Sequence, residues 1–185
     1  MHFAALPLAG AFTVSQERHH DPRGWFTRTF CRDEFVAHGL IGDFAQCSAS
    51  FTTRRGTLRG MHLQRPPHAE TKLVRCTRGA VFDVLLDLRP HSATFRHWHA
   101  VNLTEENGVA VYIPAGFAHG FQSTADDSEV SYQISERYVA VSSIGVRWND
   151  PAFGIEWPIL PPTLSGRDAG YADFCLMLRE LHAHV

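Results

Sequence analysis

Short apolar or alternating runs, separated by turn residues at close spacing, fill most of this chain and limit its fold more than any other feature. Pro66-Pro67 and Arg89-Pro90 each close a run, because proline cannot continue a hydrogen-bonded ladder. Many short strands at this spacing predict an all-β sandwich or barrel. The expected strands are Ala11–Gln16, Trp25–Phe30, Thr57–Gln64, Lys72–Thr77, Ala80–Leu88, Trp98–Leu103, Val109–Ile113, Gly120–Gln122 and Glu129–Tyr138.

Helical patterns are confined to two short segments. Arg32–His38 is compatible with one short helix, and Ala172–Leu181 spaces its apolar residues along one helical face. With 185 residues, 44% of them hydrophobic, the chain is long enough for one well-packed domain and too apolar to be disordered. We therefore expect a single domain over residues 1–185, an antiparallel barrel or jelly roll with a C-terminal appendage over about 160–185.

The charge balance and the cysteines limit partners and compartment. Seventeen basic and 19 acidic residues give a net charge of −2, which argues against a nucleic-acid partner. The sequence contains no run of about 18 apolar residues, so no membrane span is predicted. Its apolar start, Met1–Phe12, lacks the early positive charge of a signal peptide. The cysteines lie far apart without a C-x-x-C spacing, which favours buried free thiols and a cytoplasmic protein; they are Cys31, Cys47, Cys76 and Cys175.

His62 lies inside an apolar strand and has two possible roles. It could be a core imidazole with satisfied hydrogen bonds, or it could bind a metal, since small barrels with paired histidines often hold one. A second ligand would be expected at position 64, where Gln64 is a poor ligand for zinc or iron, so no metal is expected. Arg59 and His62 have opposite parity on a regular strand. Either Gly60 marks a bulge, or Arg59 faces another part of the site.

Lys72 is the only lysine among the 17 basic residues. At the start of an apolar run it could extend to solvent, or its compact ammonium could stabilise a single oxygen that gains charge. Tyr132 and Tyr138 share parity on the expected strand, about 20 Å apart. They could contact opposite ends of a long ligand, or they could simply be core aromatics.

Three further polar residues stand out. His119 lies between small residues that allow close approach of a ligand, and Asp168, in a polar loop, could orient an imidazole from outside its strand. Asp83 lies inside an apolar strand and needs an explanation.

Nine segments follow one another in a characteristic order between about residues 11 and 170. They are Asp21-Pro22-Arg23-Gly24-Trp25-Phe26, Gly56-Thr57-Leu58-Arg59-Gly60-Met61-His62, Lys72-Leu73-Val74-Arg75-Cys76-Thr77-Arg78-Gly79, Phe82-Asp83-Val84, Asp87-Leu88-Arg89, Ile113 through Phe121, Gly145 through Pro151, Ile155-Glu156-Trp157-Pro158 and Leu164–Asp168. In this order and spacing they resemble the dTDP-4-dehydrorhamnose 3,5-epimerase family of nucleotide-sugar epimerases. The family fold is a cupin-like jelly roll, usually a homodimer that exchanges N-terminal strands, and it needs no metal or other cofactor.

The resemblance implies a role for each matching residue. His62 corresponds to the general base, Asp168 to its partner, Lys72 to the group that stabilises the enolate oxygen, and Tyr132 to the acid on the other face of the sugar. Residues expected to bind substrate are Tyr138 and Gln46 at the nucleobase, Arg59, His119 and Arg167 at the diphosphate and sugar, and Arg23 and Phe26 from across the dimer. Arg28 and Ser48 are also expected near the nucleoside; there the chain has Thr27-Arg28-Thr29 where many members have Glu, and Ser48 where many have Asn.

The implied reaction is inversion of C3, C5 or both in a nucleotide-linked 4-keto-6-deoxy sugar, most simply the dTDP sugar. A carbonyl at C4 acidifies the hydrogens at C3 and C5, so a base and an acid on opposite faces of the ring would invert a centre through an enolate. Two alternatives remain at this point: a 3,4-ketoisomerase of a nucleotide 4-keto sugar, and a nucleotide-sugar-binding cupin without turnover.

Overall fold

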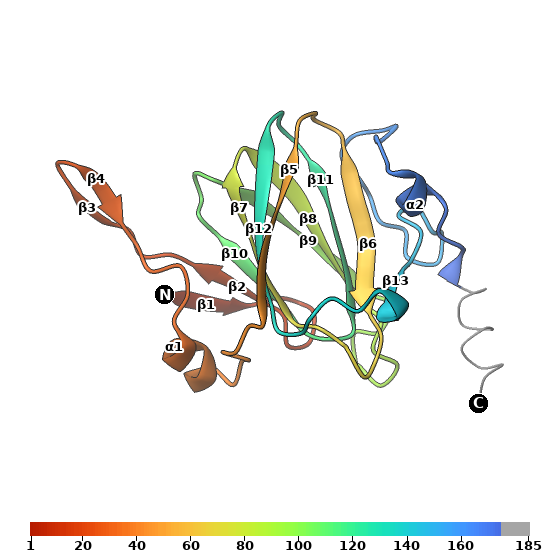
Figure 1. The fold of residues 1–185 in the computed structure, drawn as a ribbon, viewed down its shortest axis with the longest axis horizontal. Helices are drawn as coiled ribbons and strands as arrows, with labels where there is room; N and C mark the ends of the chain where they lie inside the picture. The colour runs from red at the N-terminus through yellow and green to blue at the C-terminus, as the bar shows by residue number, and fades with distance from the viewer. Residues whose placement is uncertain (175–185) are drawn as a thin grey trace.

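Two antiparallel sheets facing one another form the body of the computed structural model, which describes residues 1–174 (Figure 1). The larger sheet has the strand order β1 (His2–Ala5), β2 (Phe12–Ser15), β10 (Ala110–Ile113), β7 (Lys72–Arg78), β12 (Ser128–Ile134) and β5 (Gln46–Thr52). The smaller sheet has the order β13 (Ser143–Gly145), β6 (Leu58–Gln64), β11 (Phe117–Ser123), β8 (Ala80–Asp87) and β9 (Trp98–Thr104). The predicted all-β jelly roll is confirmed.

The remaining elements are short and peripheral. A hairpin of β3 (His19–Asp21) and β4 (Gly24–Phe26) projects from the body beside the larger sheet (Figure 1). The helical elements are α1 (Arg32–Ala37), η1 (Ala140–Ser142) and α2 (Gly166–Ala169). The expected helix over Arg32–His38 is therefore present as α1. Among residues 1–174, no helix is long and apolar enough to cross a membrane.

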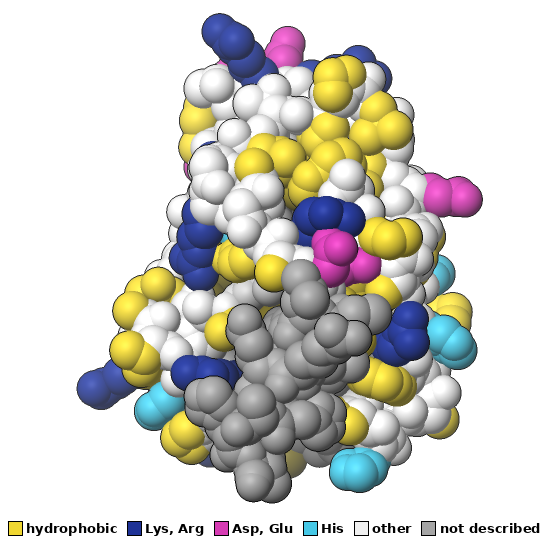
Figure 2. Space-filling view, turned by 90° about the vertical axis from the view of Figure 1, so that its right-hand side faces the viewer, with side chains coloured by type: hydrophobic (Ala, Val, Ile, Leu, Met, Phe, Trp, Pro, Cys, Tyr) yellow, Lys and Arg dark blue, Asp and Glu magenta, His cyan; other side chains and the backbone are white. Residues whose placement is uncertain are grey.

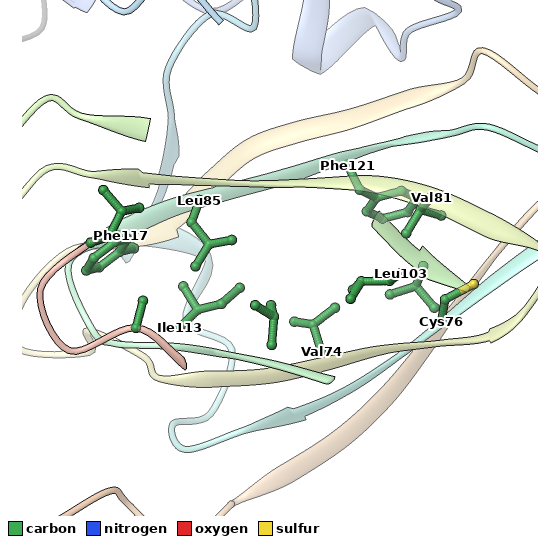
Figure 3. Packing of buried hydrophobic residues seen from close by; sticks show 12 residues of the cluster. Val74, Cys76, Val81, Leu85, Leu103, Ile113, Phe117 and Phe121 are labelled. Carbon is green, nitrogen blue, oxygen red and sulfur yellow. The ribbon is translucent and has the colours of Figure 1, made fainter. Parts of the chain in front are cut away.

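A hydrophobic core fills the space between the two sheets (Figure 3). Val74 and Ile113 of the larger sheet pack towards Leu85, Phe117 and Phe121 of the smaller one, and each is almost completely buried. Burying one such side chain contributes roughly 1.5–3 kcal/mol, before the cost of ordering it. This core fixes the distance between the two walls that carry the polar site.

A second core covers the other face of the smaller sheet. Leu58 and Met61 of β6 pack there with Phe153, Trp157 and Phe174 from the C-terminal part of the chain. Figure 2 shows this side of the molecule, where apolar side chains lie between a few charged ones. Most of the expected helix Ala172–Leu181 falls on residues 175–185 and lies outside the described residues.

Several predicted strand limits are wrong. Strand β12 ends at Ile134, where Glu129–Tyr138 was expected, because the chain leaves the sheet after Ser135 donates its amide to the carbonyl oxygen of Thr71. The expected strand Trp25–Phe30 reaches only to Phe26, since its one partner, β3, is three residues long. Strand β11 is longer than Gly120–Gln122 because it is paired along its whole length with β8. Strands β1, β3, β5 and β13 were not expected.

The cysteine prediction is correct in chemistry but partly wrong in burial. Cys31, Cys47 and Cys76 are free thiols, and Cys175 lies outside the described residues. Cys76 is buried in the core, whereas Cys47 is exposed. The reason is that Cys47 lies on β5, the edge strand of the larger sheet, with parity opposite to that of Gln46 and Ser48, which line the cavity described below.

Candidate active site

A cavity of about 360 Å³ opens between the two sheets and is lined by strands of both. Nine of the thirteen residues predicted from the sequence line it, although they come from positions 46 to 167 of the chain. They are Gln46, Ser48, Arg59, His62, Lys72, His119, Tyr132, Tyr138 and Arg167. A tenth, Asp168, lies directly behind His62.

His62 and Asp168 form a hydrogen-bonded pair at one wall of the cavity. His62 lies on β6 with its side chain 36% exposed, and its Nε2 lies 2.7 Å from Oδ1 of Asp168. Asp168 belongs to α2, whose N-cap residue Ser165 accepts a hydrogen bond from the Asp168 amide. Because a carboxylate accepts the Nε2 hydrogen, we assign the lone pair of the neutral ring to Nδ1. Nδ1 is then the ring nitrogen that can take a proton.

The pKa of Asp168 is lower than that of an ordinary aspartate. Burial by itself would raise it, but the hydrogen bond and charge of His62 outweigh burial, helped by bonds from Gly60 and Ser165. The Gly60 amide donates to Oδ2 at 3.3 Å. Asp168 is therefore a well-bound anion that can hold the imidazole in one orientation and stabilise its protonated form.

Gly60 explains how Arg59 and His62 reach the same cavity in spite of their opposite parity. His62 pairs with His119 and Arg59 with Phe121, so two residues of β6 face the single residue Gly120 of β11. This is the bulge that was one of the two expected alternatives. Gly60 has φ +145°, and a Cβ on it would lie 2.6 Å from Cα of Gly120, so no larger residue fits here.

Arg59 and Lys72 bring positive charge into the cavity. The guanidinium of Arg59 donates to Oγ1 of Thr52 and to the carbonyl oxygen of Phe51, which fixes it against β5. Lys72 begins β7, and its side chain is only 10% exposed, so the alternative of a solvent-directed lysine is wrong. Its Nζ lies 2.9 Å from Oε1 of Glu70, a cavity residue that the sequence did not single out.

Tyr132 enters the cavity from β12, in the larger sheet, whereas His62 belongs to the smaller one. Its Oη lies 3.2 Å from Oγ of Ser50, a neighbour that the sequence did not single out. Burial raises the pKa of Tyr132 well above its ordinary value, and the Ser50 bond offsets only part of this rise. Tyr132 is therefore a neutral phenol that can donate its hydrogen.

Tyr138 reaches the cavity by a route that the strand pattern did not predict. It lies beyond the end of β12, is 61% exposed, and donates its amide to Oε1 of Gln46. The argument from shared parity with Tyr132 is therefore wrong, although both tyrosines line the same cavity. Gln64 orders this segment, because its side chain bonds to Val139 and Arg137. That use accounts for a glutamine at position 64.

A second histidine–aspartate pair lies beside the first. His119 is the direct cross-strand neighbour of His62, and its Nε2 lies 2.8 Å from Oδ2 of Asp83 on β8. Directly opposed residues on neighbouring strands project from the same face of a sheet. The ring of His119 also faces Tyr132, with centroids 6.3 Å apart. This pair explains the aspartate inside an apolar strand, and His119 lies next to both His62 and Tyr132.

Arg167 lies at the cavity rim. It donates to Oγ of Ser143 at 2.9 Å and lies over the ring of Tyr171, with the guanidinium carbon 5.8 Å from the centroid. Tyr171 also contacts His62 edge-on, with ring centroids 6.0 Å apart, and was not singled out from the sequence. The aromatic ring thus holds α2 against β6.

Three predicted substrate contacts lie away from the cavity of their own chain. Arg23 bonds to Asp21 within the β3–β4 hairpin, and Phe26 is 74% exposed at its end. Arg28 follows the hairpin and pairs with Glu34 of α1 at 3.4 Å. None of these three side chains lines the cavity within one protomer.

The fold and the cavity together define a class: jelly-roll proteins that carry a histidine–aspartate pair, a buried lysine and a buried tyrosine in one pocket between the sheets. That set suits proton transfer next to a carbonyl. Within residues 1–174, no group of three or more His, Cys, Asp or Glu side chains gathers in a metal-binding arrangement.

Comparison with known proteins identifies the family within this class. Residues 5–175 match the family model described as dTDP-4-dehydrorhamnose 3,5-epimerase, so the chain belongs to that family and is an isomerase. A dTDP-4-dehydrorhamnose 3,5-epimerase of Sinorhizobium fredii is 38% identical over 95% of this chain and 90% of its own length. A dTDP-4-dehydrorhamnose 3-epimerase of Streptomyces niveus is 37% identical over 91% and 81%.

A solved structure gives the same result in three dimensions. The dTDP-4-dehydrorhamnose 3,5-epimerase of Elizabethkingia anophelis superimposes with a TM-score of 0.92 at 35% identity, over 95% of this chain and 97% of that one. The match extends over nearly the whole of both chains, and so includes both walls of the cavity.

Proposed function

We propose that this protein inverts C3 and C5 of a dTDP-linked 4-keto-6-deoxy sugar, with His62 as base and Tyr132 as acid. The observation that carries the proposal is that these two side chains enter one cavity from opposite sheets. Inversion of a carbon requires removal of hydrogen from one face of the ring and its return to the other. A sugar lying between the two walls meets both requirements.

The first half of the reaction takes place at the His62 wall. Nδ1 of His62 removes the hydrogen next to the C4 carbonyl, and the electron pair moves onto the carbonyl oxygen to give an enolate. Asp168, hydrogen-bonded to the other ring nitrogen, orients the imidazole and stabilises the imidazolium. The ammonium of Lys72 supplies the positive charge for the enolate oxygen.

The second half takes place at the opposite wall. Tyr132 donates its Oη hydrogen to the carbanionic carbon, which is a much stronger base than a phenolate. Burial, which disfavours the phenolate, keeps the tyrosine protonated until this step. Ser50 is the hydrogen-bond partner that fixes the position of Oη.

The remaining cavity residues are proposed to bind the rest of the substrate. Arg59 and Arg167 suit the diphosphate, because guanidinium groups bind phosphate oxygens in pairs. His119 is assigned to the sugar, and Tyr138, Gln46 and Ser48 to the nucleoside. Tyr138 suits stacking on a base, since its ring is exposed at the rim.

We further propose a homodimer in which Arg23, Phe26 and Arg28 serve the cavity of the partner. The support is that the β3–β4 hairpin projects from the body and leaves Phe26 exposed (Figure 1). A cytoplasmic location is also proposed, and the free thiols of Cys31, Cys47 and Cys76 support it.

Incubation with dTDP-4-keto-6-deoxyglucose in D2O, followed by NMR of the product, tests the reaction. We expect deuterium at C3 and C5 with inversion at both carbons. Deuterium and inversion at C3 alone would restrict the activity to that of a 3-epimerase. A product with its carbonyl at C3 would identify a ketoisomerase, and bound substrate without any exchange would identify a binding protein; either result rejects the proposal.

The variant Tyr132→Phe tests the division between base and acid. We expect it to slow formation of the inverted product about 100-fold or more, but to slow loss of the C3 and C5 hydrogens much less, because His62 still removes them. NMR measures both rates in one reaction. Equal loss of exchange and inversion would count against Tyr132 as the acid.

A further inference from the structure

Glu70 has no part in the proton transfers proposed above, yet its carboxylate lies in the same cavity. Its Oε1 is 2.9 Å from Nζ of Lys72, and the two side chains are 11% and 10% exposed. Removing a carboxylate and an ammonium from water carries a cost that only good geometry offsets. A negative charge beside the group assigned to an enolate also opposes that enolate. The position of Glu70 therefore needs a reason other than its charge.

A count of hydrogen-bond donors supplies that reason. An ammonium has three N–H groups and no acceptor. Nζ of Lys72 directs one towards Oε1 of Glu70, and it lies 3.4 Å from the main-chain carbonyl oxygen of His62. Within residues 1–174, two of its three hydrogens are thus held by the protein, and the third is left for a ligand in the cavity.

We propose that Glu70 is a positioning residue that aims the third N–H of Lys72 at the substrate carbonyl oxygen. A lysine side chain is a flexible stem carrying a point charge, so one anchor does not fix its direction. Glu70 and the His62 carbonyl together provide two. The second anchor belongs to the residue assigned as the base, so the same contacts link the ammonium to the wall that removes the proton.

Glu70 is itself held in place by the loop between β6 and β7. Nε2 of Gln64 donates to the carbonyl oxygen of His68, and the amide of Thr71 donates to Oγ of Ser135. These bonds fix the main chain on both sides of Glu70. The main chain at Glu70 is therefore fixed, and its carboxylate is a largely buried partner of Lys72 rather than a surface charge.

Three substitutions separate the position of the acceptor from its charge. Glu70→Gln keeps an acceptor oxygen at the same reach and removes the charge, whereas Glu70→Asp keeps the charge and shortens the side chain by one methylene. Glu70→Ala removes both. We expect Glu70→Gln to retain kcat within about fivefold, and Glu70→Asp and Glu70→Ala to lose about 10- to 100-fold, the loss of one hydrogen bond to a charged group.

The inference rests on the proposed function, so the readout is solvent exchange at C3 and C5 together with product formation. We expect the loss of activity in these variants to appear as a lower kcat, with KM changed by less than about threefold. The reason is that the third N–H acts on the enolate rather than on the nucleotide. In a Lys72→Ala background, Glu70→Ala should add no further loss. Glu156→Ala, at an exposed glutamate, is the matched control and should behave as wild type.

Each result then bears on one idea only. Absence of exchange in the wild type would overturn the proposed function before Glu70 is tested. With an active wild type, a Glu70→Gln variant as slow as Glu70→Ala, or faster than wild type, would show that the charge matters and overturn the positioning role. So would a full additional loss in the Lys72→Ala background. Thermal unfolding and dTDP affinity, measured on every variant, distinguish a folding defect from a misdirected Lys72 ammonium.

Discussion

The two histidine–aspartate pairs of the cavity differ in exposure although they lie side by side on neighbouring strands. The His62 side chain is 36% exposed and that of Asp168 is 5%, whereas those of His119 and Asp83 are 5% and 0%. Asp168 comes from a four-residue helix beside the sheet, and Asp83 from a strand within it. The same two residue types thus form an accessible pair and a sealed one.

The difference shows how surroundings decide what a histidine–aspartate pair can do. A base needs a free ring nitrogen that reaches the substrate, so the exposed pair suits proton transfer. The sealed pair is held by the sheet and contributes a fixed surface beside Tyr132. One carboxylate oxygen of Asp83, Oδ1, has no hydrogen-bond partner among the described residues. The bond from His119 to the other oxygen is therefore the side-chain contact that stabilises this buried carboxylate.

The largest expected effect comes from changing each histidine in the same way. His62→Asn should slow exchange at C3 and C5 about 1000-fold, because the base is lost, while dTDP still binds. His119→Asn should slow exchange about tenfold, since asparagine can still bond to Asp83. NMR exchange rates with a dTDP-binding assay make the comparison. Equal losses in the two variants would remove the distinction between the pairs.

The order should reverse when stability is measured. His119→Ala leaves Asp83 buried without a partner, and breaking such a pair costs about 3 kcal/mol of the free energy of unfolding. His62→Ala should cost about 1 kcal/mol, because Asp168 keeps the Gly60 amide and gains access to water. Urea denaturation at pH 7 measures both. A larger loss for His62→Ala would contradict the assignment of the sealed pair.

Asp168→Asn tests whether the exposed pair works through its charge. The amide keeps the size of the side chain but presents no anion to Nε2 of His62, so the imidazolium is less stable and the ring can adopt the wrong tautomer. We expect exchange about 100-fold slower, with KM little changed. Steady-state kinetics check this, and a variant within threefold of wild type would show that Asp168 is not needed.

The smallest expected effect is a dependence of stability on pH. The folded-state pKa of Asp168 is below the ordinary value of 3.8, so its carboxylate stabilises the fold above that pH. This contribution is lost as pH falls through the lowered pKa. The difference in unfolding free energy between wild type and Asp168→Asn should therefore shrink as pH falls from about 5 to below about 4. A difference that stays constant in acid would argue against the lowered pKa.

The sequence predicted which residues form the site better than it predicted which neighbours hold them in place. Resemblance to one family brought His62, Asp168, Lys72 and Tyr132 together, and all four lie at one cavity. No role for Glu70 could be predicted, because a glutamate beyond two prolines carries no periodic signal, even though it lies two positions before Lys72.

Two other partners lie far from the residues that they contact. Ser50 and Tyr132 are 82 positions apart, and Tyr171 is more than a hundred positions from His62. No local pattern in a single sequence connects residues at such separations. These contacts exist only because strands and loops from different parts of the chain meet.

The strands were predicted where burial imposes a pattern and missed where it does not. Strands β7 and β8 are largely buried, and their apolar runs were recognised nearly to the residue. Strand β5 is mostly exposed, and its apolar residues Cys47, Ala49 and Phe51 alternate with polar ones but are mostly small, so the hydrophobic signal is weak. It is a strand because β12 pairs with it along seven residues.

By itself, the sequence determined the all-β class, the family and the chemical types gathered at the site, because alternation, turns and ordered motifs are properties of the chain. Only the tertiary structure decided which aspartate bonds to which histidine. It also decided that a bulge at Gly60 directs the side chains of Arg59 and His62 into the same cavity, and that Glu70 anchors Lys72. Those outcomes depend on strand register and on burial, and both are set by pairing between segments far apart in the chain.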